Sequence, residues 1–141
     1  CAITVVMGAM APHLEDVCRR AKNMPWATRV LVDVGNMARL MADSDLAIGA
    51  AGATAWERCC LGLPSLMTVL AENQQEVSSA LVQAGAAVSF PLLPAIGARL
   101  RDTFSKLTSH TPSLQQMSQF AAQITQGQGT ALVLQELGRR G

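Results

Sequence analysis

Short apolar runs alternate with helical patterns along residues 1–90. Five of these runs are apolar or β-branched and are bounded by Gly, Pro or Asp, as is typical of strands buried on both faces of a sheet. They lie at residues 3–7, 28–32, 46–48, 65–69 and 86–90. Helices are expected between them, at about 13–23, 36–43, 54–61 and 73–84. This alternation predicts an α/β fold with one open parallel sheet of about five to six strands and helices on both faces.

Helical periodicity continues to the end of the chain. In the helix expected at 73–84, Val77, Ala80, Leu81 and Ala84 fall on one face, which should be buried. After residue 95, further apolar stripes predict a helical C-terminal cover. Because no linker-like stretch interrupts the sequence, residues 1–141 are expected to form a single domain. The chain starts with Cys1 inside a predicted strand rather than with Met, which suggests a domain taken from a two-domain protein.

Composition excludes several classes of function. Half of the residues are apolar, 15% are charged and the net charge is +1, so no basic patch for nucleic acid or a membrane surface is expected. No apolar run reaches the roughly 18 residues of a membrane span.

The four cysteines include adjacent Cys59 and Cys60 but no Cys-x-x-Cys pair. We therefore expect no metal site and no disulfide, but free buried thiols in a reducing cytoplasm.

The segment at residues 49–57 carries the clearest chemical signal. Five small residues, Gly-Ala-Ala-Gly-Ala, follow a strand and precede a helix, and they leave room for a ligand to approach the backbone. Phosphate can sit on the free N–H groups of such a helix start, and the carboxylate of Glu57 can take ribose hydroxyls. A structural alternative is a capping box, with Thr54 as N-cap and Glu57 three residues later. Downstream, Gly62 is expected to end the helix in a left-handed conformation.

Two other polar segments follow predicted strands. Residues 72–76, Glu-Asn-Gln-Gln-Glu, come after the fourth strand, at the edge where open α/β sheets bind ligands. Their alternative role is to cap the next helix through Asn73 and Glu76. His13 follows the first strand, and it is either a phosphate or acid–base group or an exposed histidine at a helix start.

The run at residues 37–64 is specific enough to resemble a known family. It contains Trp56-Glu57-Arg58-Cys59-Cys60-Leu61-Gly62-Leu63-Pro64, and Ala71-Glu72-Asn73-Gln74 follows it. These residues resemble the C-terminal domain of the UDP-sugar hydrolases of the pseudaminic acid pathway. A looser resemblance exists to the N-acetylglucosaminyltransferases that make lipid II, which share the two-domain glycosyltransferase-B architecture.

The resemblance implies a Rossmann-like domain that holds UDP or a UDP-sugar without a metal or cofactor. The implied ligand contacts are uracil at the loop containing Val34, diphosphate at Gly52, Ala53 and Thr54, ribose at Glu57, and diphosphate or sugar at Glu72, Asn73 and Gln74. No catalytic residue is implied in this chain, since the family's catalytic histidine lies in an N-terminal domain. The chain departs from the family at residues 8–12, where a hydroxyl and a carboxylate of the family's loop are missing.

Three functions stay open at this point. The first is the UDP-binding half of a hydrolase that releases UDP from a diacetamido-trideoxyhexose in nonulosonic acid synthesis, inactive without its N-terminal partner domain. The second is the donor-binding domain of a UDP-sugar glycosyltransferase. The third is a non-catalytic module for binding or regulation.

Overall fold

The computed structural model describes residues 1–91, 96–109 and 111–139. The chain divides into two compact units, residues 1–37 and 38–141. The expectation of a single domain stays a prediction.

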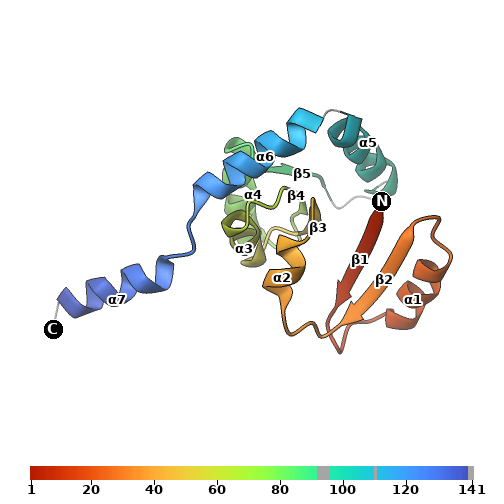
Figure 1. The fold of residues 1–141 in the computed structure, drawn as a ribbon, viewed down its shortest axis with the longest axis horizontal. Coiled ribbons are helices and arrows are strands. Elements are labelled where there is room, and N and C mark those ends of the chain that lie inside the picture. The colour runs from red at the N-terminus through yellow and green to blue at the C-terminus, as the bar shows by residue number, and fades with distance from the viewer. Residues whose placement is uncertain (92–95, 110, 140–141) are drawn as a thin grey trace. The chain divides into compact units, whose positions relative to one another are not determined.

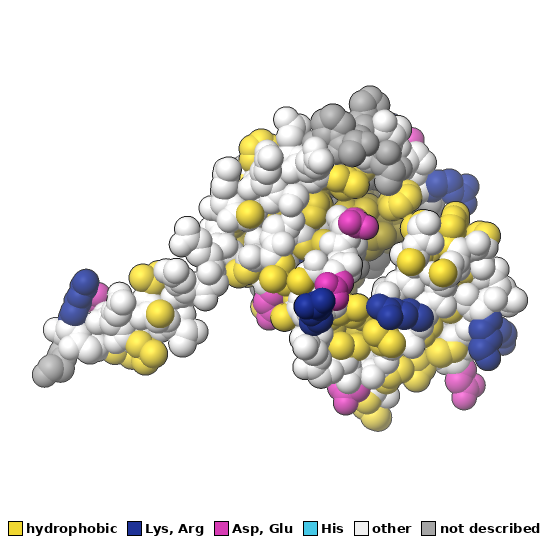
Figure 2. All heavy atoms as spheres, in the orientation of Figure 1, with side chains coloured by type: hydrophobic (Ala, Val, Ile, Leu, Met, Phe, Trp, Pro, Cys, Tyr) yellow, Lys and Arg dark blue, Asp and Glu magenta, His cyan; other side chains and the backbone are white. Residues whose placement is uncertain are grey.

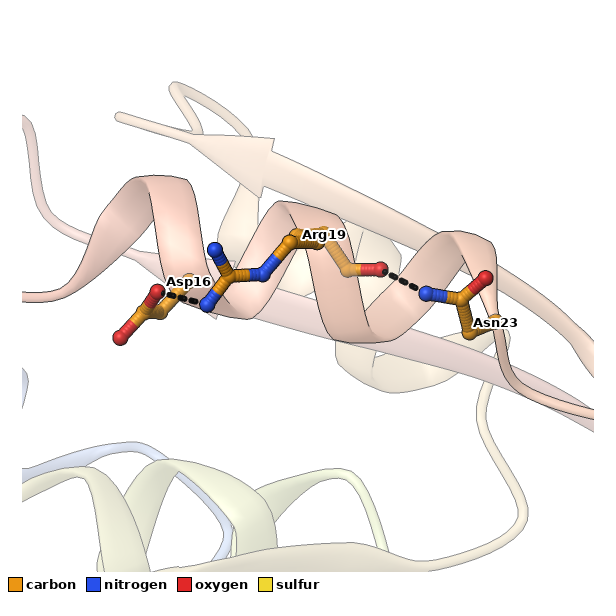
Figure 3. A network of polar contacts seen from close by, with 3 residues as sticks. All are labelled: Asp16, Arg19 and Asn23. Atoms are coloured by element: carbon orange, nitrogen blue, oxygen red, sulfur yellow. Dashed lines mark hydrogen bonds and ion pairs between the residues drawn. The ribbon is translucent and has the colours of Figure 1, made fainter.

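The first unit of the chain is a single β-α-β motif. Strand β1 (Ala2–Met7) pairs in parallel with β2 (Ala27–Val32), and helix α1 (Leu14–Lys22) connects them. Acidic residues occupy the first turn of α1 and basic residues its last turn, which complements the helix dipole. Arg19 pairs with Asp16 one turn earlier, and the side-chain amide of Asn23 donates to the Arg19 carbonyl oxygen at 3.1 Å (Figure 3). These contacts hold α1 together locally but are exposed, so each contributes little to stability.

The second unit has three strands and a series of helices (Figure 1). Its strands are β3 (Ala47–Ala50), β4 (Ser65–Thr68) and β5 (Ala87–Ser89). Its helices are α2 (Met37–Ala42), α3 (Thr54–Cys60), the short 3-10 helix η1 (Glu72–Gln74), α4 (Gln75–Gln83), α5 (Ile96–Ser109), α6 (Thr111–Ile124) and α7 (Gly129–Arg139). The strands pair in parallel in the order β3-β4-β5, with Ala50 opposite Thr68. The carboxyl ends of β3 and β4 therefore lie at one edge of this sheet.

The predicted α/β class with parallel strands is confirmed. The five strands match the predicted runs closely, and their hydrogen bonds arrange them in sheets of two and three strands. The predicted end of α3 is also confirmed, because Gly62 has a φ of 61° and the N–H of Leu63 donates back to the Arg58 carbonyl oxygen at 2.9 Å.

The core of the second unit is built from small and flexible apolar side chains. Ala51, Met67 and Ala121 are fully buried in it, and α6 packs along α3 to bring Ala121 there. The predicted buried face of α4 is partly wrong: Leu81 is buried, but Ala80 and Ala84 are exposed. Ser78 is buried instead, and its hydroxyl is satisfied by a hydrogen bond to the Ser89 hydroxyl at 3.0 Å.

Helix α7 has no buried residue, and hydrophobic side chains lie along its surface (Figure 2). Its Leu132, Val133, Leu134 and Leu137 are each at least 59% exposed. No described helix is both long and apolar enough to cross a membrane.

Candidate functional site

The segment between β3 and α3 forms a tight turn at the carboxyl edge of the three-stranded sheet. Ala51 is completely buried, and its N–H donates to the Thr68 carbonyl oxygen at 3.1 Å, which fastens the turn to β4. Gly52 is half-buried, while Ala53 and Thr54 are exposed. Among the hydrogen bonds of the described residues, none uses the backbone N–H of Gly52 or Ala53 as donor. Both groups are thus available to an acceptor such as a phosphate oxygen.

The capping box expected at Thr54 and Glu57 is wrong. Ala53 is the N-cap residue, and Thr54 is already the first residue of α3, with no side-chain cap bond at this helix end. Backbone hydrogen bonds alone form the start of the helix: the N–H of Ala55 donates to the Gly52 carbonyl oxygen at 2.9 Å, and that of Trp56 to the Ala53 carbonyl oxygen at 3.0 Å. Glu57 therefore lies exposed in the first turn, and capping does not account for its carboxylate.

The polar segment after β4 reaches the same turn. The backbone N–H of Leu70 donates to Gln74 Oε1 at 3.0 Å. This bond fixes the amide so that its nitrogen is the free end, and Nε2 lies 3.7 Å from the point where a Cβ on Gly52 would stand. A donor group of η1 thus faces the glycine of the β3–α3 turn.

The capping role expected for Asn73 and Glu76 is also wrong. The residue before α4 is Gln74, and no side chain caps the helix. The chain instead makes a 3-10 turn, with the N–H of Gln74 donating to the Ala71 carbonyl oxygen at 3.0 Å. Glu72 and Asn73 are exposed, and together with Glu76 they line an open hollow of about 670 Å³. They are consequently free to contact a ligand rather than bound up in a helix end.

The remaining predicted residue, Val34, belongs to the first unit. It follows β2 and is half-buried. The preceding Asp33 has a φ of 53°, and its N–H donates to the Met7 carbonyl oxygen at 3.0 Å. In the same unit, His13 is exposed, as one of its two interpretations expected, and stands just before α1 with a φ of 65°. Seven of the eight predicted residues thus belong to the second unit, where Gln74 approaches Gly52, and Val34 belongs to the first.

Sequence reasoning missed the burial of Arg58, which is only 5% exposed. The signal was present, because Ala55, Arg58 and Cys59 stand at i, i+3 and i+4 on the buried face of α3. Burial lowers the pKa of the Arg58 guanidinium, and the neighbouring Cys59 and Glu57 partly oppose this change.

All four cysteines are free thiols. Cys59 is buried and Cys60 exposed, so the two adjacent side chains do point to different faces. The expectation of buried thiols is wrong for the others, since Cys1 is exposed and Cys18 half-buried. In the part of the chain that the structure describes, His, Cys, Asp and Glu side chains form no group of three or more suited to a metal ion.

The fold and the sequence together define a glycosyltransferase-like domain. Residues 3–133 match the glycosyltransferase family 28 C-terminal domain, and the chain belongs to this family. The spore coat polysaccharide biosynthesis protein SpsG of Bacillus subtilis (strain 168) is 34% identical over 87 residues, which make up 62% of this chain and 25% of that protein.

Solved structures show the same fold. MurG of Acinetobacter baumannii superimposes with a TM-score of 0.81 at 22% identity, over 98% of this chain and 42% of that one. The glycotransferase of kitacinnamycin has a TM-score of 0.64 at 16% identity, over 96% of this chain and 43% of its own. The chain thus spans about a quarter of the curated relative and less than half of either solved chain.

Proposed function

We propose that this chain is the donor-binding domain of a glycosyltransferase-B enzyme and that its donor is a UDP-sugar. The observation that carries the proposal is the meeting of two loops in a member of family 28: the turn after β3 and the segment after β4 approach each other at Gly52 and Gln74. Ligands of open parallel sheets bind at this kind of edge. Both loops expose polar groups there that the described fold itself does not use.

Each group has a separate task in this proposal. The backbone N–H groups of Gly52 and Ala53 bind the diphosphate, beside Thr54, and the amide nitrogen of Gln74 donates to the diphosphate or the sugar. Glu57 accepts hydrogen bonds from the ribose hydroxyls. The N–H groups of Gly52 and Ala53 and the amide of Gln74 stabilise the negative charge that grows on the diphosphate as the bond to the sugar breaks. The scheme uses no metal ion and no cofactor.

Two further contacts belong to the proposal. Glu72 and Asn73, in the hollow beside η1, face the sugar or the diphosphate. Val34, in the first unit, stays the predicted backbone contact for the uracil. The acceptor-binding site and any catalytic base are supplied by an N-terminal domain of the same protein. Free thiols such as those of this chain suit a reducing compartment, so we place the reaction in the cytoplasm.

A second candidate is a hydrolase that releases UDP from a diacetamido-trideoxyhexose. The run of residues 56–64 favours it through the resemblance to the UDP-sugar hydrolases of the pseudaminic acid pathway. Both candidates need the same UDP contacts and differ in what attacks the sugar. Release of UDP from the whole protein in the absence of any acceptor would favour the hydrolase, whereas release only with an acceptor would favour the transferase.

The proposed UDP site is tested by titrating the 141-residue chain with UDP while following its amide resonances. We expect changes clustered at residues 52–57, 72–74 and near Val34. Uridine, which lacks the diphosphate, should leave the resonances of Gly52 and Ala53 in place, and ADP should bind more weakly than UDP. Changes scattered over the surface, or equal responses to UDP and ADP, would contradict a UDP-specific site.

A further inference from the structure

Arg58 is a buried charge in the middle of the candidate site's scaffold. Its side chain lies on the inner face of α3, next to Ala55 and Cys59. None of the ion pairs formed by the described residues includes it. A guanidinium stays charged even when burial lowers its pKa, so the fold must satisfy this cation by other means.

The fold satisfies it with backbone carbonyl groups of the β3–α3 turn. Nη2 of Arg58 donates to the Ala50 carbonyl oxygen at 2.7 Å, and Nε donates to the Thr54 carbonyl oxygen at 3.2 Å. Ala50 is the last residue of β3 and Thr54 the first residue of α3. One side chain therefore connects the two ends of the turn that carries Gly52 and Ala53.

The surroundings of Arg58 are matched to this role. Its Nη1 lies 3.6 Å from the point where a Cβ on Gly49 would stand, so the guanidinium packs flat against a strand residue without a side chain. A planar group with several N–H donors in fixed directions can bond two carbonyl groups at once. The single ammonium of a lysine, on a flexible stem, cannot reproduce that geometry.

We propose that Arg58 is a positioning residue of the UDP site: by bonding the carbonyl groups of Ala50 and Thr54, it holds the N–H groups of Gly52 and Ala53 in the conformation that binds diphosphate. This inference rests on the proposed function for its ligand. The geometry of the turn itself can be tested without any ligand.

The experiment compares Arg58→Lys with Arg39→Lys, since Arg39 is an exposed arginine of the same unit. In the protein without ligand, Arg58→Lys should shift the amide resonances of Gly52, Ala53 and Ala55 and leave those of β5 in place. Its Kd for UDP should rise about tenfold or more. Arg39→Lys should change neither the resonances of the turn nor the Kd.

Rescue separates positioning from general loss of stability. In Arg58→Ala, millimolar methylguanidinium should return the resonances of the turn to their wild-type positions and restore UDP binding. Arg39→Ala gives no such response.

Unmoved resonances of the turn in Arg58→Lys would overturn the inference, and so would an unchanged Kd or a failure of methylguanidinium to rescue Arg58→Ala. If the wild-type chain binds no UDP but Arg58→Lys shifts the resonances of the turn as expected, the proposed function fails and the positioning of the turn by Arg58 stands.

Discussion

The side-chain amide nitrogen of Gln74 lies 3.7 Å from the point where a Cβ on Gly52 would stand. The opposite end of that amide is held by the N–H of Leu70, so the nitrogen is the end that faces the turn. Gln74 follows β4 and Gly52 follows β3, and the parallel pairing of these strands brings the two residues to one edge. A side-chain donor of one loop therefore lies close to the backbone of the other loop.

Replacing Gln74 with Glu should weaken UDP binding about tenfold or more, a change of roughly 1.4 kcal/mol. The new carboxylate has nearly the same shape, but it removes a donor and places negative charge beside the diphosphate. Gln83→Glu is the matched control, because Gln83 is an exposed residue at the end of α4, the helix that follows Gln74, and the change in net charge is identical. Calorimetric titration with UDP measures both variants, and equal Kd values would mean that Gln74 does not face the ligand.

Replacing Glu57 with Ala should cost about 1–3 kcal/mol of UDP binding, since a charged acceptor of ribose hydrogen bonds is lost. The free energy of unfolding should change by less than about 0.5 kcal/mol, because Glu57 is exposed and caps no helix. Glu15→Ala removes an equivalent exposed glutamate from the first turn of α1 and should leave the Kd unchanged. A Glu57 variant that loses stability but keeps its affinity for UDP would assign the residue a purely structural role.

The strands were predictable because parallel strands are continuous apolar runs, and five such runs became the five strands. Their predicted burial is only partly right, because β4 is buried along its whole length whereas β1 and β2 contain no buried residue. The buried face of α4 was not fully predictable. Ala80 and Ser78 both fit the helical spacing, and hydrophobicity favours burying the alanine. In the structure Ser78 is the buried one, and its hydroxyl has a hydrogen-bond partner in Ser89, which comes from β5. Partners that arrive from distant elements are invisible to local periodicity.

The candidate site shows the same division between local pattern and tertiary contact. The segments at 49–57 and 72–76 could be singled out by their residues alone. The spacing of Thr54 and Glu57 fits a capping box, but the helix begins one residue earlier than that box requires, with Ala53 as N-cap and backbone carbonyl groups accepting from the N–H groups of Ala55 and Trp56. Burying Arg58 goes against residue preference, and it becomes favourable only where the carbonyl groups of Ala50 and Thr54 receive its hydrogen bonds.

Replacing Gly85 with Ala should lower the free energy of unfolding by about 2 kcal/mol. Gly85 has a φ of 74°, and a Cβ there would stand 2.9 Å from Cδ2 of Phe120 on α6. Both the strained backbone and the displaced ring oppose the change. Urea unfolding measures it, and adding Phe120→Leu should recover part of the loss if the ring contributes to it.

The matched glycine for this test is Gly97, in helix α5, where nothing lies within 4 Å of an added Cβ. Gly97→Ala should leave the free energy of unfolding unchanged or raise it by up to about 1 kcal/mol, because alanine is the better helix former. An equal loss in both variants would mean that neither the backbone angle of Gly85 nor its contact with Phe120 matters.

Cys59 should make the domain less stable in mildly alkaline solution. Burial raises the pKa of its thiol above the ordinary value, with Arg58 opposing the change and Cys60 adding to it. The folded state therefore holds this proton more tightly than the unfolded state, and the resulting stabilisation is complete below the unfolded pKa of about 8.5. It is lost as the pH rises from there through the folded pKa.

Unfolding measured in urea from about pH 7 to 10 should show this fall in the wild type and a flatter profile in Cys59→Ala. Cys60→Ala removes an exposed thiol and should retain the wild-type slope, whereas equal slopes in all three proteins would mean that the ionisation of Cys59 is not linked to folding.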